Sequence, residues 1–117
     1  MKETTQATMG HTRVVRVEAP AWLDARGICA LLRGASEAFA SGAKTIVIDF
    51  VQVRGLDPTG IRGLVTIKNA APAGTAVVLA QMNRSIQAIA RFTLLHHIFD
   101  TYASFDAAAT ALDAKAR

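Results

Sequence analysis

The alternation of apolar and polar stretches along the chain predicts strands that alternate with helices. Thr45 to Phe50 is a nearly continuous apolar and β-branched run, too short and too rich in β-branched residues to form a helix of its own. Runs of this kind are typical of strands buried on both faces of a parallel sheet. We therefore predict a central strand at residues 45–50, and the similar run at residues 75–80 predicts another buried strand.

Apolar residues at helical spacing predict helices between these strands. Asp24 is a good N-cap, and the apolar side chains that follow it predict an amphipathic helix that ends near Gly42. Further along, Asn83 and Ser104 can cap two more helices, and a short strand is predicted between them at residues 98–102.

Another helix is predicted directly after the central strand, from Pro58 to about Ala71. The Asp57 carboxylate can cap this helix, and proline at the first helical position loses only an N–H that has no partner inside the helix. With a helical period of about 3.6 residues, Gly60 falls on the inner face. The outer face is expected to carry Thr59, Arg62, Gly63, Thr66 and Asn69.

Together these elements predict a single α/β domain. Residues 13–18 form the first clear strand, whereas residues 1–12 are polar and are either a tail or a weak edge strand. Strands that alternate with helices pair in parallel through right-handed crossovers. Because the direction of the first strand is open, we expect a mixed sheet of about four to five strands, with about four helices, in a domain at residues 13–117.

The composition narrows the class of protein. A length of 117 residues fits one domain, and a hydrophobic fraction of 51% fits a folded core. No apolar run approaches the ~18 residues of a membrane span, and the polar N-terminus lacks the apolar segment of a signal peptide, so we expect a cytoplasmic protein without membrane insertion. The single cysteine, Cys29, excludes an internal disulfide and a cysteine-based zinc site.

The charged residues do not indicate binding to nucleic acid or metal. The net charge of +4 comes from 13 Lys and Arg against 9 Asp and Glu, but the basic residues are spread singly, which fits a solvated surface or an acidic protein partner. One tryptophan and one tyrosine offer little surface for base stacking. His96, His97 and Asp100 superficially resemble a metal site, but adjacent histidines point in different directions and a closed site needs more ligands, so we expect neither a metal nor a cofactor.

The hydroxyl of Thr59 is the candidate group for chemistry, because it sits in the first turn of the predicted helix. A helix start carries partial positive charge and unpaired N–H groups, so a phosphate is tolerated or favoured there. Phosphorylation would add about −1.5 to −2 charges, enough to change how a partner docks. The alternative is that residues 57–60 are a plain helix cap. We expect no enzyme, because the chain has no nucleophile beside a base and no glycine-rich phosphate cradle.

The residues after the central strand form a motif that, with other segments, resembles a known family. Residues 56–61 read Leu-Asp-Pro-Thr-Gly-Ile, residues 104–108 read Ser-Phe-Asp-Ala-Ala, and Leu23-Asp24 precedes the first helix. In their order and position they make the chain similar, over residues 12–112, to the STAS domain, the fold of bacterial anti-sigma factor antagonists. That family has a serine pair or Ser-Thr before the motif glycine, so a proline here replaces the first serine.

The resemblance implies a non-enzymatic regulatory module that works by partner switching, with Thr59 as the phosphoacceptor. In the family, a kinase of the histidine-kinase-like ATPase fold, which doubles as an anti-sigma factor, phosphorylates this position, and a phosphatase restores it. The unmodified form captures the kinase and frees the sigma factor, which regulates transcription. The expected partner-binding residues are Asp24, Asp57, Pro58, Gly60, Arg62 and Gly63.

The family also suggests an alternative in which phosphorylation is not needed. Stand-alone STAS proteins also bind transport ATPases, so this chain is alternatively an accessory subunit of a membrane transporter of the ABC type. Pro58 makes this alternative more credible than usual, because it removes a hydroxyl and an N–H donor from the motif.

Overall fold

A computed structural model describes residues 4–9, 12–93 and 95–116, and within them strands and helices alternate as the sequence predicts. The elements, in chain order, are β1 (Thr4–Met9), β2 (Thr12–Glu18), β3 (Trp22–Leu23), α1 (Ala25–Ala40), β4 (Thr45–Asp49), β5 (Gly55–Leu56), α2 (Pro58–Ala70), β6 (Ala76–Ala80), α3 (Arg84–Arg91), α4 (Leu95–Ile98), β7 (Thr101–Tyr102) and α5 (Phe105–Ala116).

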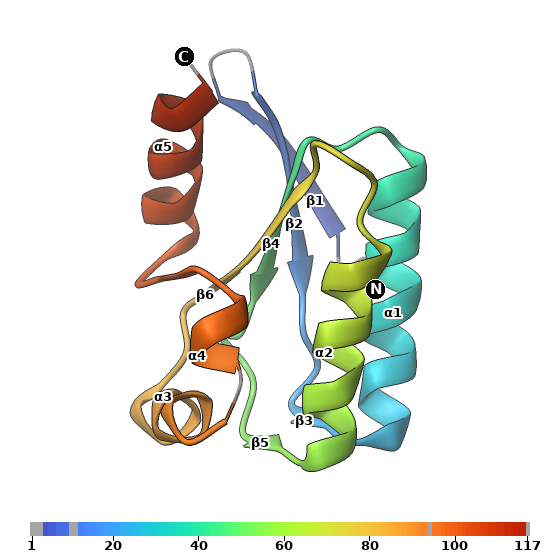
Figure 1. The fold of residues 1–117 in the computed structure, drawn as a ribbon, viewed down its shortest axis with the longest axis vertical. Coiled ribbons are helices and arrows are strands. Elements are labelled where there is room, and N and C mark those ends of the chain that lie inside the picture. Colours follow the sequence, from blue (N-terminus) through green and yellow to red (C-terminus); the bar gives the residue numbers. More distant parts are fainter. Residues whose placement is uncertain (1–3, 10–11, 94, 117) are drawn as a thin grey trace.

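The main sheet is mixed, and β4 lies at its centre (Figure 1). The strand order is β1-β2-β4-β6-β7, in which β2, β4, β6 and β7 pair in parallel and β1 pairs with β2 in the antiparallel direction. All five residues of β4 are buried, because neighbouring strands flank it and helices cover both faces. The predicted central strand and mixed sheet are therefore confirmed, and residues 4–9 form the edge strand that was one of two expectations for the N-terminus.

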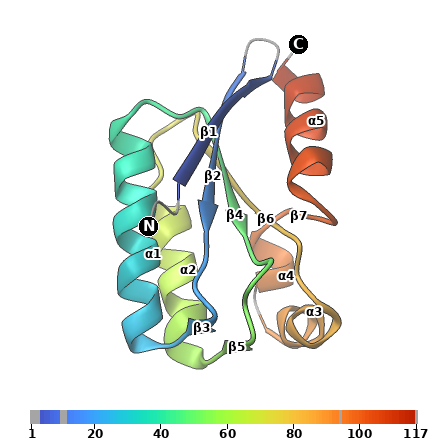
Figure 2. The ribbon, with the colours of Figure 1, turned by 180° about the vertical axis from the view of Figure 1, so that it is seen from behind.

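Helices cover the two faces of the sheet unequally. The neighbouring helices α1 and α2 lie on one face, whereas α5 lies on the other (Figures 1 and 2). The helices α3 and α4 are drawn below α5, but their buried side chains, such as Ile86 and Leu95, belong to the apolar cluster shared with α1 and α2. The larger cluster of buried apolar side chains includes Leu31, Ile48 and Leu64, between the sheet and the helix pair. A smaller cluster, which includes Val47, Val78 and Ala108, lies beneath α5.

The four predicted N-caps are confirmed. Asp24, Asp57 and Asn83 each accept a hydrogen bond from a backbone N–H in the first turn of the following helix, at 2.9 Å. Ser104 accepts one from Ala107 N at 3.0 Å. Each cap satisfies a donor that the helix itself leaves unpaired, which explains why these helices begin where the sequence predicts.

The segment near residue 98 differs from the prediction. The expected strand at residues 98–102 is only Thr101–Tyr102, and the helix α4, at Leu95–Ile98, precedes it. Leu95 and Phe99 are both buried, and Phe99 N donates to Leu95 O at 2.9 Å. Two buried residues four positions apart lie on the same side of either a helical turn or a strand. The short apolar run therefore did not distinguish a helix from a strand. The described residues therefore hold five helices rather than about four.

Candidate functional site

Two short parallel strands place the starts of α1 and α2 next to each other. In the small second sheet β3 pairs with β5, with Trp22 opposite Gly55 and Leu23 opposite Leu56. The pairing continues one residue further, because Asp57 N donates to Leu23 O at 3.2 Å. Both strands run directly into helix caps, so the first turns of α1 and α2 lie side by side at the lower end of the molecule (Figure 2).

The motif residues have distinct positions in the first turn of α2. The Asp57 carboxylate is occupied as a cap, since it accepts from Gly60 N at 2.9 Å. Pro58 is exposed at the first helical position, and Thr59 follows it with a half-buried side chain. The Thr59 hydroxyl does not serve as the cap, and this leaves its oxygen available to other groups.

Arg62 lies one turn further along α2 and reaches back to Thr59. Its guanidinium Nη2 donates to Thr59 Oγ1 at 3.4 Å, and both groups lie on the exposed side of the helix. Thr66, another turn along, donates its hydroxyl to Arg62 O at 3.0 Å. A negatively charged group on Thr59 Oγ1 would therefore meet a guanidinium as well as the positive end of the α2 dipole.

The two glycines of the motif region are buried, and for Gly63 this corrects the sequence expectation. A Cβ on Gly60 would lie 2.1 Å from Leu23 O, and one on Gly63 would lie 1.9 Å from Ile28 Cγ1. Gly63 was expected on the exposed face, where a partner could approach it, and this was wrong. Because α2 packs against α1 as well as against the sheet, its buried face is wider than the apolar stripe indicates.

Trp22 is a surface residue of this region that the sequence did not single out. Its side chain is 60% exposed, and its ring lies against Gly55, where a Cβ would come within 2.5 Å of indole Cε3 and Cζ3. Leu23 beside it is buried, so the alternation of a strand turns the indole outward. Exposed aromatic side chains are typical anchors at protein interfaces, and this is the signal that could have identified it.

An open hollow of about 810 Å³ lies beside Trp22 at the start of α1. Asp24 and Asp57 both line it, together with Arg26. The structure therefore brings the two predicted acidic residues to one surface, although they are 33 positions apart (57 − 24) in the sequence. Thr59 lies in the first turn of α2, two residues after Asp57, and Arg62 follows one turn further along.

A buried carboxylate supports the loop that leads into the motif. Asp49, at the end of β4, is fully buried and forms an ion pair with Arg16 at 2.5 Å. It also accepts from Val51 N at 2.8 Å and from the Gln81 amide at 3.1 Å. Gln81 has a φ of 62°, an unusual conformation for a residue other than glycine. The network ties the ends of β2, β4 and β6 to the start of the loop at residues 50–54.

Neither a metal site nor a membrane span is present among the described residues. No three or more His, Cys, Asp or Glu side chains there gather closely enough to hold a metal ion, and this includes the described His96, His97 and Asp100. In the same part of the chain, no helix combines the length and the apolar character that crossing a bilayer requires.

The fold, the capped motif and the order of the elements agree with the comparison to known families. The family model of the STAS domain matches residues 5–108, so the chain belongs to the STAS domain family. Among curated proteins, none matched this sequence.

Solved structures with the same fold come from two kinds of protein. An anti-sigma factor antagonist from Mycobacterium paratuberculosis is similar with a TM-score of 0.76 at 22% identity, over 92% of each chain. The phosphorylated form of the Bacillus cell fate determinant SpoIIAA is similar with a TM-score of 0.64 at 15% identity, over 93% of this chain and 98% of that chain. A sulfate transporter family protein from Wolinella succinogenes has a TM-score of 0.62 at 18% identity, over 87% of this chain and 86% of that chain.

Proposed function

We propose that this protein is a non-enzymatic, cytoplasmic regulatory module of the anti-sigma factor antagonist type, which switches partners when Thr59 is phosphorylated. The observation that carries the proposal is the position of the Thr59 hydroxyl, in the first turn of α2 and within hydrogen-bonding distance of Arg62. The STAS family membership and the similarity to a solved protein in a phosphorylated form support it.

The physical basis of the switch is a change of charge on a surface that already carries charges. A phosphate on Thr59 Oγ1 adds about −1.5 to −2 charges. Arg62 and the start of α2 can compensate part of this charge, so the modified domain keeps its fold. A partner that approaches Trp22, Asp24 and Asp57 meets a more negative surface after the modification. If the partner places acidic groups opposite this surface, repulsion weakens the interface after the modification and the partner is released.

The partner expected by this proposal is a kinase of the histidine-kinase-like ATPase fold that also acts as an anti-sigma factor, opposed by a phosphatase. The kinase has to place ATP next to an exposed hydroxyl, and Thr59 is the one hydroxyl of residues 56–61. The unmodified protein would capture the kinase and so free a sigma factor. No cofactor of this chain takes part.

Mass spectrometry of the protein from its native cells, purified under phosphatase inhibition, tests the proposal. We expect a population heavier by one phosphate, with the phosphate located on Thr59 by fragment mapping. Thr66→Ala, which removes another exposed hydroxyl of α2, is the matched control and should keep the modification, whereas Thr59→Ala should lose it. An unmodified mass across growth and stress conditions would contradict the switch.

The similarity to a sulfate transporter family protein favours a second candidate function. The solved structure links this fold to a transporter family. The candidate is then an accessory subunit of a membrane transporter, of the ABC type in our proposal, which binds a transport ATPase without phosphorylation. Pro58 is consistent with this function, since it leaves the motif with a single hydroxyl. Affinity purification from native membranes distinguishes the two candidates. Recovery of a transport ATPase with both the parent protein and Thr59→Ala supports the accessory subunit, and recovery of a kinase alone supports the switch.

A further inference from the structure

A second hollow lies away from Thr59, between α3, α4 and β7. Its volume is about 250 Å³. The residues that line it are Met82, Gln87, Ala90, Arg91, His96, Thr101, Tyr102 and Ala103. Polar groups from three separate elements therefore converge on one small cavity, which is the usual arrangement of a small-molecule site.

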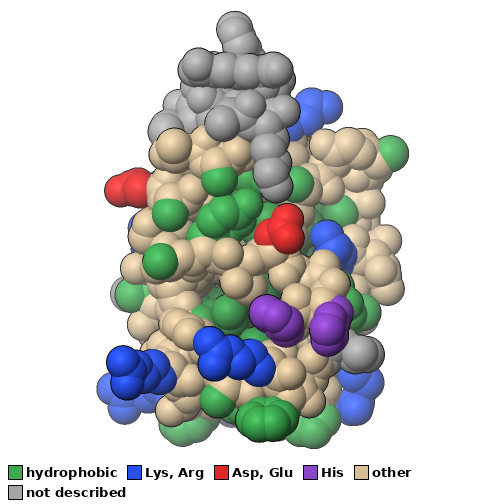
Figure 3. All heavy atoms as spheres, turned by 60° about the vertical axis from the view of Figure 1, so that its left-hand side comes forward, with side chains coloured by type: hydrophobic (Ala, Val, Ile, Leu, Met, Phe, Trp, Pro, Cys, Tyr) green, Lys and Arg blue, Asp and Glu red, His purple; other side chains and the backbone are tan. Residues whose placement is uncertain are grey.

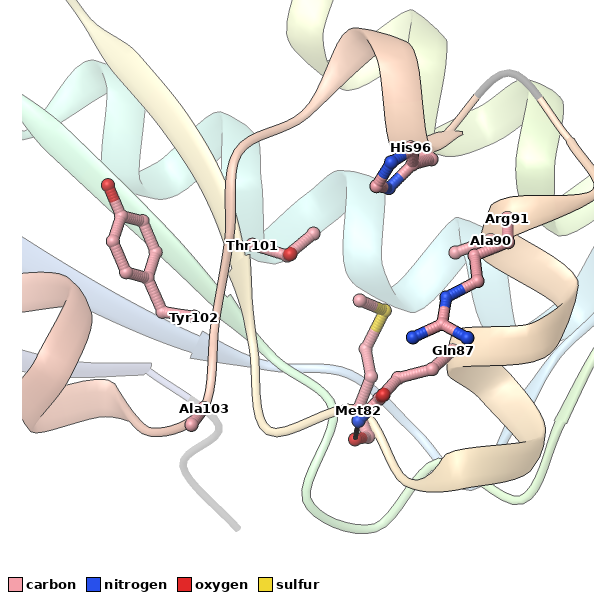
Figure 4. A pocket seen from close by; sticks show the side chains of 8 residues that line it. All are labelled: Met82, Gln87, Ala90, Arg91, His96, Thr101, Tyr102 and Ala103. Atoms are coloured by element: carbon pink, nitrogen blue, oxygen red, sulfur yellow. Dashed lines mark hydrogen bonds between the residues drawn. The ribbon is translucent and has the colours of Figure 1, made fainter.

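The side chains that face this cavity are polar on most sides and apolar on one side. Arg91 from the end of α3, His96 from α4 and Thr101 from β7 surround one space, with the Met82 side chain on the remaining side (Figure 4). Gln87 is occupied elsewhere, since its Nε2 donates to Met82 O at 2.7 Å and holds that wall in place. The Tyr102 ring points away, toward the apolar cluster beneath α5.

Arg91 lines the cavity, and it has no carboxylate partner among the described side chains. Among the residues whose side chains the structure describes, no carboxylate lies within 4.0 Å of Arg91. The ion pair found in this part of the chain joins Arg16 to Asp49, and neither of these residues lines the cavity. Figure 3 views the face that α5 forms above and α3 and α4 form below, and its lower half carries histidine side chains and basic side chains, with an acidic side chain above the histidines. A guanidinium without a carboxylate partner is well suited to bind a carboxylate or a phosphate with two parallel hydrogen bonds.

We propose that this cavity binds a small organic anion with a carboxylate or phosphate head group. Arg91 and His96 hold the head group, and the Thr101 hydroxyl donates a further hydrogen bond. The apolar part of the ligand lies against Met82 and Ala90. The cavity, at about 250 Å³, is smaller than the roughly 300–1,000 Å³ of sites for drug-sized ligands, so the ligand is no larger than about one substituted ring. The proposal does not involve Thr59, so its test is independent of the test of the partner switch.

The test is a titration of the isotope-labelled full chain, in which NMR spectra record the chemical shifts of the backbone amides. The probes are phenyl phosphate, benzoate and benzyl alcohol, which share an aromatic ring and differ in the head group. We expect saturable shifts at Arg91, His96 and Thr101 with at least one of the two anions, and the stronger anion identifies the head group. Benzyl alcohol should cause no saturable shift. Equal binding of benzyl alcohol, or no saturation with either anion, would overturn the proposal.

Two arginines on the same helix provide a matched pair of variants. Arg91→Gln should weaken the binding of the preferred anion at least about tenfold, because it removes a charge-assisted hydrogen bond. Arg84→Gln removes the same charge from an exposed residue of α3 that does not line the cavity, and it should change the affinity less than about twofold. Because Arg91 is exposed, both variants are expected to keep the dispersed spectrum of the folded parent. Equal losses in the two variants would mean a diffuse attraction to positive charge and would also contradict the site.

Discussion

The guanidinium of Arg62 reaches back one turn along α2 and donates a hydrogen bond to the hydroxyl of Thr59, at 3.4 Å between Nη2 and Oγ1. At this distance the bond is weak, and both side chains have access to solvent. Thr59 therefore contributes little to the fold, whereas the cap of the same helix comes from Asp57. The division of roles between the two residues leads to the first prediction.

Replacing Thr59 by Ala should leave the fold intact, whereas replacing Asp57 by Ala should weaken it. We expect the free energy of unfolding to change by less than about 0.5 kcal/mol for Thr59→Ala, as for most partly exposed positions. Asp57→Ala should lower it by about 0.5–2 kcal/mol, because Gly60 N loses its acceptor. Denaturant unfolding of both variants measures the difference. A loss at Thr59 as large as the loss at Asp57 would make the hydroxyl a structural cap.

Reversing the charge beside the motif should weaken the binding of an acidic partner. Arg62 contacts Thr59, and Arg54 lies in the loop that precedes β5; both are exposed. We expect the double variant Arg54→Glu/Arg62→Glu to bind the cognate kinase at least about tenfold more weakly, since like charges then face each other. Titration calorimetry provides the affinity. Arg33→Glu/Arg84→Glu makes the same change of charge on α1 and α3 and is the control. Unchanged affinity of the first variant would show that these arginines do not face the partner.

Adding a methyl group at Gly63 should disturb the contact between α1 and α2. A Cβ there would lie 1.9 Å from Ile28 Cγ1, so one side chain or helix has to move. Overpacking of this kind costs about 1–3 kcal/mol, which exceeds the gain of about 1 kcal/mol in helix propensity on replacing Gly by Ala. We therefore expect Gly63→Ala to be destabilised.

A second substitution tests whether the Gly63 effect comes from this contact. Ile28→Ala removes the atoms that a methyl group at position 63 would meet, so Gly63→Ala should cost less in that background than in the parent. Equal costs in the two backgrounds, measured by denaturant unfolding, would place the strain elsewhere.

The Asp49 carboxylate should be important for stability. Asp49→Ala removes the partner of Arg16 and the acceptor of Val51 N, so we expect a loss of roughly 3 kcal/mol in the free energy of unfolding. Glu37→Ala, at an exposed position of α1, serves as the control and should change stability by less than about 0.5 kcal/mol. If both variants unfold at the same denaturant concentration, the buried network does not hold the sheet ends together.

Local sequence patterns were sufficient to predict most of the elements and their starts. The β-branched run at residues 45–50 predicted a buried strand of the sheet, because successive residues of a strand point to opposite faces and both faces have to be covered when all of them are apolar. Asp24, Asp57, Asn83 and Ser104 marked the helix starts, because a cap acts only on the N–H groups two or three residues away. The position of Thr59 in the first turn of α2 follows from the same local rule.

Tertiary packing decided which surfaces remain exposed and which groups meet. The sequence alone determined that α2 exists and where it begins, but the burial of Gly63 depends on Ile28, which lies on another helix. Trp22 is exposed and the hollow beside it is lined by Asp24 and Asp57, because β3 pairs with β5. The cavity of Arg91, His96 and Thr101 arises only where α3, α4 and β7 converge. Helical and strand periods describe each element by itself, whereas these contacts depend on how distant elements pack, and no local pattern contains that information.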